Sequence, residues 1–116
     1  MHTISFKHAW DGLTHAVSTQ PNFAVHLFFS TLAIVAGIAL NISGLEWIVI
    51  ALTVVVGLVI ELVNTAIEST VDLITRKYNR LAKIAKDTAA AAMLVYAVGA
   101  LVVAAVIFVP KIWRFI

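Results

Sequence analysis

Three long apolar stretches with very few charged side chains limit what this chain can fold into. The first lies at about 23–42 and the third at about 87–110, and each is long enough to cross a bilayer as a helix. Only 12% of the 116 residues are charged, against about 25% in soluble domains, and none is cysteine. The sequence therefore predicts an all-α membrane protein with a single domain, 1–116, and excludes disulfides and thiolate metal sites.

The middle stretch, at about 47–71, differs from the other two because its charge-free part covers only residues 47–60. A helix needs about 20 residues to cross the apolar layer, so this span has to extend beyond its charge-free part. It then includes Glu61 and Glu68. We expect three transmembrane helices, of which the second contains acidic side chains.

The segment at about 4–19 is expected to form an amphipathic helix on the membrane surface, before a break at Pro21. At 100° per residue, four apolar side chains fall in one stripe. They are Phe6, Trp10, Leu13 and Val17, and the far side holds Lys7, His8, Asp11 and His15. The alternative is an ordinary packed helix of a soluble domain.

The distribution of basic residues predicts how the chain crosses the membrane. The connection at 41–46 has no Lys or Arg, whereas the one between the second and third spans holds Arg76, Lys77, Arg80, Lys83 and Lys86. Basic loops stay in the cytoplasm, so we expect this loop and the N-terminus inside and the C-terminus outside. Lys111 and Arg114 argue against this orientation but are outnumbered. Orientation explains the basic residues better than nucleic-acid binding does.

Four polar residues of the second span share one side of the predicted helix. They are Glu61, Asn64, Glu68 and Asp72, which we call the acidic edge. Their spacing places them within about 80° of one another around the helix axis. An ionised side chain in the apolar layer costs roughly 2.5 kcal/mol or more, so such acids usually serve ion pathways, proton relays or ligand contacts. For Glu68 and Asp72 the alternative is a solvated helix end.

The third span begins with Lys86 and Asp87, directly before four alanines at 89–92 that would let another helix approach closely. Close packing would bring this pair toward the acidic edge. Carboxylates and an amide suit magnesium, and an ammonium group suits phosphate, so the set fits chemistry on magnesium-bound phosphate. The alternative for Lys86 is simple snorkelling at a helix end.

The sequence contains none of the glycine-rich nucleotide-binding motifs of soluble proteins and no H-E-x-x-H helix. Any phosphate site must therefore be assembled from side chains on helices. His26, in the first span, has no second histidine at ligand spacing. It is better explained as an interhelical hydrogen-bond partner than as a metal ligand.

Two segments identify a family resemblance: ELVNTAIESTVDL at 61–73 and AKIAKDTAAAAMLV at 82–95. The chain resembles the small prokaryotic diacylglycerol kinases from about Phe6, through PNFAVHL and Glu46-Trp47, to FVPK ending at Lys111. The resemblance implies a lipid kinase of the bacterial cell membrane that uses ATP and Mg2+, with its active site on the cytoplasmic side. It also implies a homotrimer of three-span protomers, each with a surface helix.

The resemblance also implies roles for individual residues. Glu61 corresponds to the catalytic base, Asn64 to a neighbour that orients the reacting groups, and Glu68 to a magnesium ligand. The nucleotide-binding set is Lys86, Asp87, Tyr78 and Asn79, with which we group Asp72. Gln20 stands where some members carry a metal-binding glutamate, and an amide can coordinate magnesium only through its carbonyl oxygen.

The expected reaction is transfer of the γ-phosphoryl group of ATP to diacylglycerol, giving phosphatidic acid. Undecaprenol is the alternative acceptor, because the family includes kinases of that lipid. Two readings from other classes stay open on the residues alone: a small ion-coupled transporter, which also uses an intramembrane glutamate, and a non-catalytic helper subunit.

Overall fold

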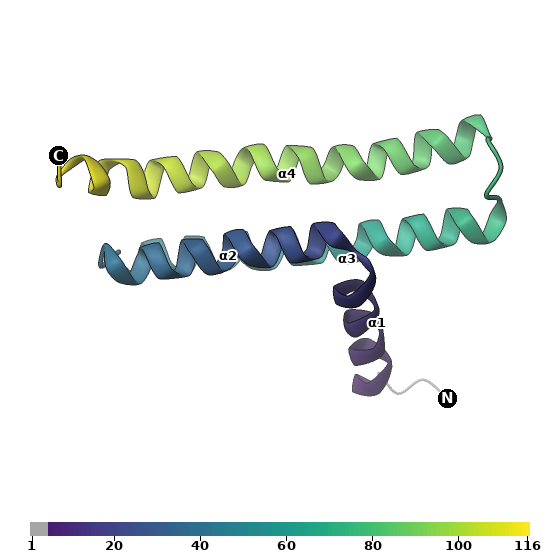
Figure 1. Cartoon of the computed structure of the whole chain (residues 1–116), viewed down its shortest axis with the longest axis horizontal. Coiled ribbons are helices and arrows are strands. Elements are labelled where there is room, and N and C mark those ends of the chain that lie inside the picture. The colour runs from purple at the N-terminus through teal and green to yellow at the C-terminus, as the bar shows by residue number, and fades with distance from the viewer. Residues whose placement is uncertain (1–4) are drawn as a thin grey trace.

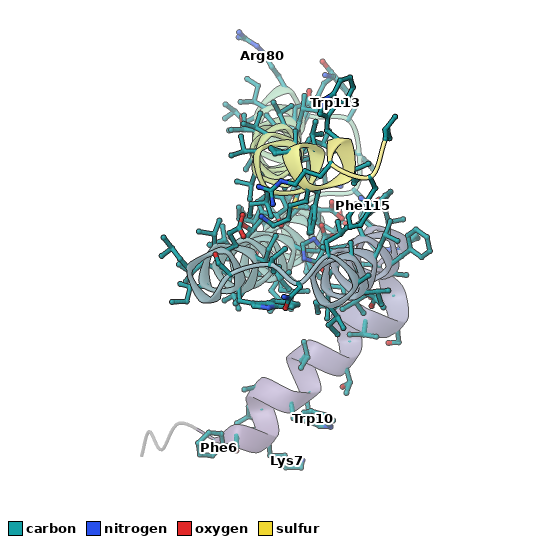
Figure 2. All side chains as sticks on the ribbon, turned by 90° about the vertical axis from the view of Figure 1, so that its left-hand side faces the viewer. Phe6, Lys7, Trp10, Arg80, Trp113 and Phe115 are labelled. Atoms are coloured by element: carbon teal, nitrogen blue, oxygen red, sulfur yellow. The ribbon has the colours of Figure 1, made fainter. Side chains whose placement is uncertain are left out.

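The computed structural model describes residues 5–116 as four helices. They are α1 (Phe6–Thr19), α2 (Pro21–Ala39), α3 (Gly44–Ile74) and α4 (Arg80–Trp113). In Figure 1, α4 runs alongside α2 and α3, which overlap in that view, and α1 leaves the bundle at a steep angle. Figure 2 looks along the bundle and shows α2 and α3 side by side against α4. The described chain is therefore a three-helix bundle with one projecting arm.

The expectation of three membrane-spanning helices is confirmed in length and composition. α2, α3 and α4 have 19, 31 and 34 residues, and each is long and apolar enough to cross a membrane. At 1.5 Å per residue α3 is about 46 Å long, whereas the apolar layer is about 30 Å thick. The ends of α3 and α4 therefore extend into the interfacial or aqueous regions.

The first span is displaced from the expected 23–42, because α2 begins at Pro21 and ends at Ala39. Asn41 adopts a φ of 52°, in the left-handed region that asparagine tolerates better than most residues. This residue reverses the chain. Ser43 then caps α3 in a capping box, in which its side chain accepts a hydrogen bond from the Glu46 N–H and its own N–H donates to the Glu46 carboxylate.

Helix α1 occupies most of the predicted segment at 4–19, although the expected start at residue 4 lies outside the described residues. Gln20 is extended, with φ −107° and ψ 108°, and Pro21 opens α2, where its missing N–H costs nothing. Ala16 is buried where α1 meets the bundle, whereas Phe6 and Trp10 lie at the far end of the arm and are 87% and 64% exposed (Figure 2). Binding of this arm to a membrane surface stays a prediction.

The end of the bundle where α3 begins is closed by apolar packing and an ion pair. Ile42, Ile50, Ile107 and Phe108 form a buried cluster there. Beside it the Lys111 ammonium lies 2.9 Å from the Glu46 carboxylate and joins the end of α4 to the start of α3. The opposite end, at the basic loop, holds the polar residues described next.

Candidate active site

The inward face of α3 carries Glu61 at its centre. The buried residues of this helix are Ile50, Gly57, Glu61, Asn64 and Thr65. Glu61 has 0% of its surface exposed, so a carboxyl group lies fully inside the bundle of a single chain. Two residues of the acidic edge, Glu61 and Asn64, are thus buried against the other helices.

Polar atoms at Glu61 and Asn64 lack hydrogen-bond partners. Within residues 5–116, neither Glu61 carboxylate oxygen accepts a hydrogen bond, and the Asn64 side-chain oxygen is also unpaired. The Asn64 amide donates to Glu68 Oε1 at 3.1 Å, so it links the buried and half-buried parts of the acidic edge. Leaving a buried polar group unpaired costs about 1–3 kcal/mol, which makes a structural role for Glu61 unfavourable.

The acidic edge ends at an ion pair between helices. The Lys86 ammonium of α4 lies 2.6 Å from Asp72 Oδ1 of α3, and both side chains are about two-fifths exposed. Asp87, the neighbour of Lys86, instead pairs with Lys83 at 2.5 Å on its own helix. The expected approach of the pair to the acidic edge is therefore seen for Lys86 and not for Asp87.

A shallow cavity of about 220 Å³ opens at the α3–α4 loop, and we call it the basic recess. Its lining is Thr75, Arg76, Lys77, Tyr78, Asn79, Ala82, Lys83, Lys86 and Asp87. Asn79 also caps α4, since its side-chain oxygen accepts from Leu81 N at 2.9 Å and Ala82 N at 3.2 Å. The structure thus brings four of the predicted nucleotide-binding residues, Lys86, Asp87, Tyr78 and Asn79, to one recess, and Lys86 connects that recess to Asp72.

Most of the chain matches one known protein family. The family of prokaryotic diacylglycerol kinases matches residues 7–108. The chain belongs to this family. The resemblance noted in the sequence is thereby confirmed.

Several members of the prokaryotic diacylglycerol kinase family are similar to this chain over most of its length. A diacylglycerol kinase of Synechocystis is 41% identical over 110 residues, which are 94% of this chain and 63% of that protein. An undecaprenol kinase of Bacillus subtilis is 42% identical over 108 residues, 93% of this chain and 88% of that protein. A diacylglycerol kinase of Escherichia coli K12 is 28% identical over 106 residues. The chain thus spans less than two thirds of the Synechocystis protein.

The oxygen atoms of the acidic edge are of the kind that a magnesium ion prefers. Residues 5–116 include no cluster of three or more Asp, Glu, His or Cys side chains that could hold a metal by themselves. Magnesium does not need such a cluster, because one or two carboxylates and the phosphates of the nucleotide usually suffice. Glu68 and the unpaired Asn64 oxygen supply hard ligands of this type. Gln20 lies half-buried between α1 and α2.

Two aromatic side chains also bind to the backbone of α3. His26 of α2 lies with Nε2 3.2 Å from the Val54 carbonyl oxygen, which confirms the predicted interhelical hydrogen bond. The Tyr96 hydroxyl of α4 donates to the Thr53 carbonyl oxygen at 2.7 Å. Sequence reasoning missed Tyr96, although it is the only polar side chain between Thr88 and Lys111. That isolation was the available signal, since a buried phenol usually finds a partner.

Proposed function

We propose that this chain is an ATP- and magnesium-dependent lipid kinase that transfers the γ-phosphoryl group of ATP to the hydroxyl of diacylglycerol, giving phosphatidic acid. One observation supports this most directly. The Glu61 carboxylate is fully buried, has no hydrogen-bond partner among the described residues, and lies on the helix face that leads to the basic recess. A base at membrane depth and a cationic recess at the interface suit a lipid alcohol and a nucleotide, respectively. Family membership points to the same reaction.

Glu61 acts as the general base in this proposal. It accepts the proton of the lipid hydroxyl as the oxygen attacks the γ-phosphorus in line and the bond to the β-phosphate oxygen breaks, leaving ADP. Burial excludes water, which favours the lipid alcohol as the acceptor. Asn64 stands one turn nearer the interface and orients the reacting groups through its amide.

The residues of the basic recess hold the nucleotide. Lys86 contributes a positive charge for the phosphates, and Asp72 fixes that ammonium group at the end of the acidic edge. Asp87, Tyr78 and Asn79 line the same recess and complete the nucleotide site. Positioning and charge stabilisation supply most of the catalysis in phosphoryl transfer, so a preformed cationic recess is the useful contribution of the chain.

Glu68 would hold the magnesium ion, with the Asn64 side-chain oxygen as a second ligand. Glu68 stands about 10 Å along the helix from Glu61, toward the interface, which is the direction of the recess. Bound magnesium neutralises charge on the phosphates. Gln20 is a further ligand through its carbonyl oxygen.

Undecaprenol is the second candidate for the acceptor lipid. The undecaprenol kinase of Bacillus subtilis matches this chain as well as the Synechocystis diacylglycerol kinase does, at 42% and 41% identity. Diacylglycerol and undecaprenol both present one free hydroxyl at the membrane interface. The same base and recess serve either alcohol.

The proposed setting is the bacterial cell membrane, with the basic loop and the active site on the cytoplasmic side and three copies forming a homotrimer. The acidic edge gives no reason of its own for assembly, because Glu61 and Asn64 are already covered within one chain. The proposal of a trimer therefore rests on the family resemblance. Cross-linking in lipid tests it, and a monomeric, fully active preparation contradicts it.

A single assay tests the reaction and ranks the two acceptors. Purified protein is incubated in mixed micelles with γ-labelled ATP, magnesium, and either diacylglycerol or undecaprenol, and the lipid extract is separated. We expect labelled phosphatidic acid, and a chelator of divalent cations should abolish the labelling. Absence of labelled lipid with both acceptors would overturn the kinase proposal and leave the transporter and helper readings.

A further inference from the structure

Two side chains from different helices converge on one short segment of α3. His26 reaches it from α2 and Tyr96 from α4, and their ring centroids are 5.7 Å apart. Their hydrogen bonds end on consecutive carbonyl groups, those of Val54 and Thr53. A carbonyl oxygen has two lone pairs, so each can accept a side-chain hydrogen bond in addition to its bond within the helix. Two neighbouring helices are therefore attached to α3 at the same level.

Gly57 makes this arrangement possible. A Cβ atom added at Gly57 would overlap His26 Cε1, and also Tyr96 Cζ and its hydroxyl oxygen. Any larger residue at this position would push both rings away from the α3 backbone. The His26–Gly57–Tyr96 cluster is thus a close contact that depends on a missing side chain.

The cluster lies next to the proposed base. Gly57 precedes Glu61 by four residues, which is about 6 Å along the axis on the same face of the helix. Both residues are buried.

The position of Glu61 depends on such a framework, because its carboxylate has no hydrogen bond of its own within the described chain. Side chains of the described residues bond α3 to other helices at Glu46, Thr53, Val54 and Asp72. The bonds at Thr53 and Val54 are the nearest in sequence to Glu61. They are the contacts best placed to fix the helix that carries the base.

We propose that His26 and Tyr96 are positioning residues for phosphoryl transfer: by hydrogen bonding to α3 across Gly57, they hold α2 and α4 at the spacing that places Glu61 against the acceptor hydroxyl. The inference rests on the kinase function proposed above. The role belongs to the N–H and O–H donors, and no proton is transferred through either ring. A misplacement of about 1 Å can reduce a rate about a hundredfold, so small shifts of α2 or α4 are enough to matter.

Side-chain variants test the donors one at a time. Tyr96→Phe removes only the hydroxyl, and His26→Asn removes the donor at the Nε2 position, so both should lower kcat about tenfold. KM for ATP should not change, because the basic recess lies at the far end of the acidic edge. His26→Gln keeps an N–H near the position of Nε2 and should retain most of the turnover. A glutamine variant as inactive as the asparagine variant would overturn the positioning role, because it would mean that the imidazole itself is required.

A glycine series separates positioning from general packing. Gly57→Ala should lower kcat per folded molecule about a hundredfold. Gly37→Ala is the matched control, because a Cβ there would also be crowded, at 2.7 Å from Trp47, but at the closed end of the bundle. Gly99→Ala meets nothing within 4 Å and should be neutral. The fraction of folded protein in each variant is determined from its unfolding curve in detergent.

The outcomes distinguish this inference from the function on which it rests. A wild-type protein that labels no lipid overturns both. An active wild type whose Tyr96→Phe variant keeps full kcat, or whose Gly37→Ala and Gly57→Ala variants lose turnover equally, overturns the positioning role alone. The Tyr96→Phe result decides the question even if Gly57→Ala does not fold.

Discussion

Replacing Glu61 with glutamine separates the catalytic role of this residue from any structural one. Glutamine keeps the size of the side chain and removes its ability to take a proton. Loss of a general base lowers turnover by at least about a hundredfold, which raises the activation barrier by about 2.7 kcal/mol at 1.36 kcal/mol per tenfold change. We expect this loss with both diacylglycerol and undecaprenol, because the same base serves either acceptor.

The free energy of unfolding should not fall in parallel. Both Glu61 oxygens are buried with no partner in residues 5–116, so the folded state already carries the cost of an unpaired polar group. The free energy of unfolding of the Glu61→Gln variant should therefore lie within about 1 kcal/mol of the wild-type value. Glu61→Leu removes the orphaned oxygens altogether and should be more stable by about 1–3 kcal/mol while equally inactive.

A second carboxylate provides the control. Glu46 lies at the closed end of the bundle, where its side chain is 26% exposed and that of its partner Lys111 is 18% exposed. The Glu46→Gln variant weakens that pair and should lower stability only slightly, with unchanged turnover per folded molecule. Turnover is measured by lipid labelling and stability by denaturant titration in detergent. Near-normal turnover of Glu61→Gln would refute its role as a base. A fall in the free energy of unfolding as large as the rise of about 2.7 kcal/mol in the activation barrier would show that Glu61 is a structural residue.

Three further substitutions test the remaining parts of the site. Lys86→Met should raise KM for ATP about tenfold or more. Lys7→Met removes a lysine whose ion pair with Asp11 is exposed and which does not line the basic recess, so it should change this KM little. Equal effects would contradict the nucleotide role of Lys86. Gln20→Glu should lower the magnesium concentration at half-maximal activity, because a carboxylate binds the ion better than an amide does. An unchanged magnesium titration would show that residue 20 does not belong to the metal site. Asn64→Ala frees Glu68 Oε1 from its 3.1 Å hydrogen bond. This variant should lower kcat about tenfold and raise the magnesium concentration needed for activity. A change in KM for ATP alone would argue against Asn64 as an orienting residue and as a magnesium ligand.

Regular helix geometry explains which parts of the site the sequence could predict. The spacing of Glu61 and Asn64 fixes their angle around the axis, and the cost of exposing them to lipid turns that side inward. The same cost predicts that His26 finds a partner on another helix, as it does at Val54. These predictions depend on one helix at a time and on a single energetic rule.

Contacts between helices depend on register and side-chain conformation, which the sequence does not specify. Lys86 and Asp87 are adjacent, yet one pairs with Asp72 across the helices and the other with Lys83 on its own helix. The bond of Tyr96 to the Thr53 carbonyl likewise requires the relative shift of α3 and α4. The early end of α2 has a local cause, the left-handed conformation at residue 41, that apolar patterning could not reveal.

Comparison of Glu61 with the other acidic side chains strengthens the case for placing the chemistry at Glu61. The sequence has six Asp and Glu residues, and five of them have a partner: Asp11 with Lys7, Glu46 with Lys111, Glu68 with Asn64, Asp72 with Lys86, and Asp87 with Lys83. The sixth, Glu61, is the most buried and has none within the described residues. Stability alone would favour the opposite arrangement, because an acid costs most where it is buried and unpaired. The bundle therefore tolerates this carboxylate at the expense of its own stability, as expected where a substrate hydroxyl supplies the missing hydrogen bond.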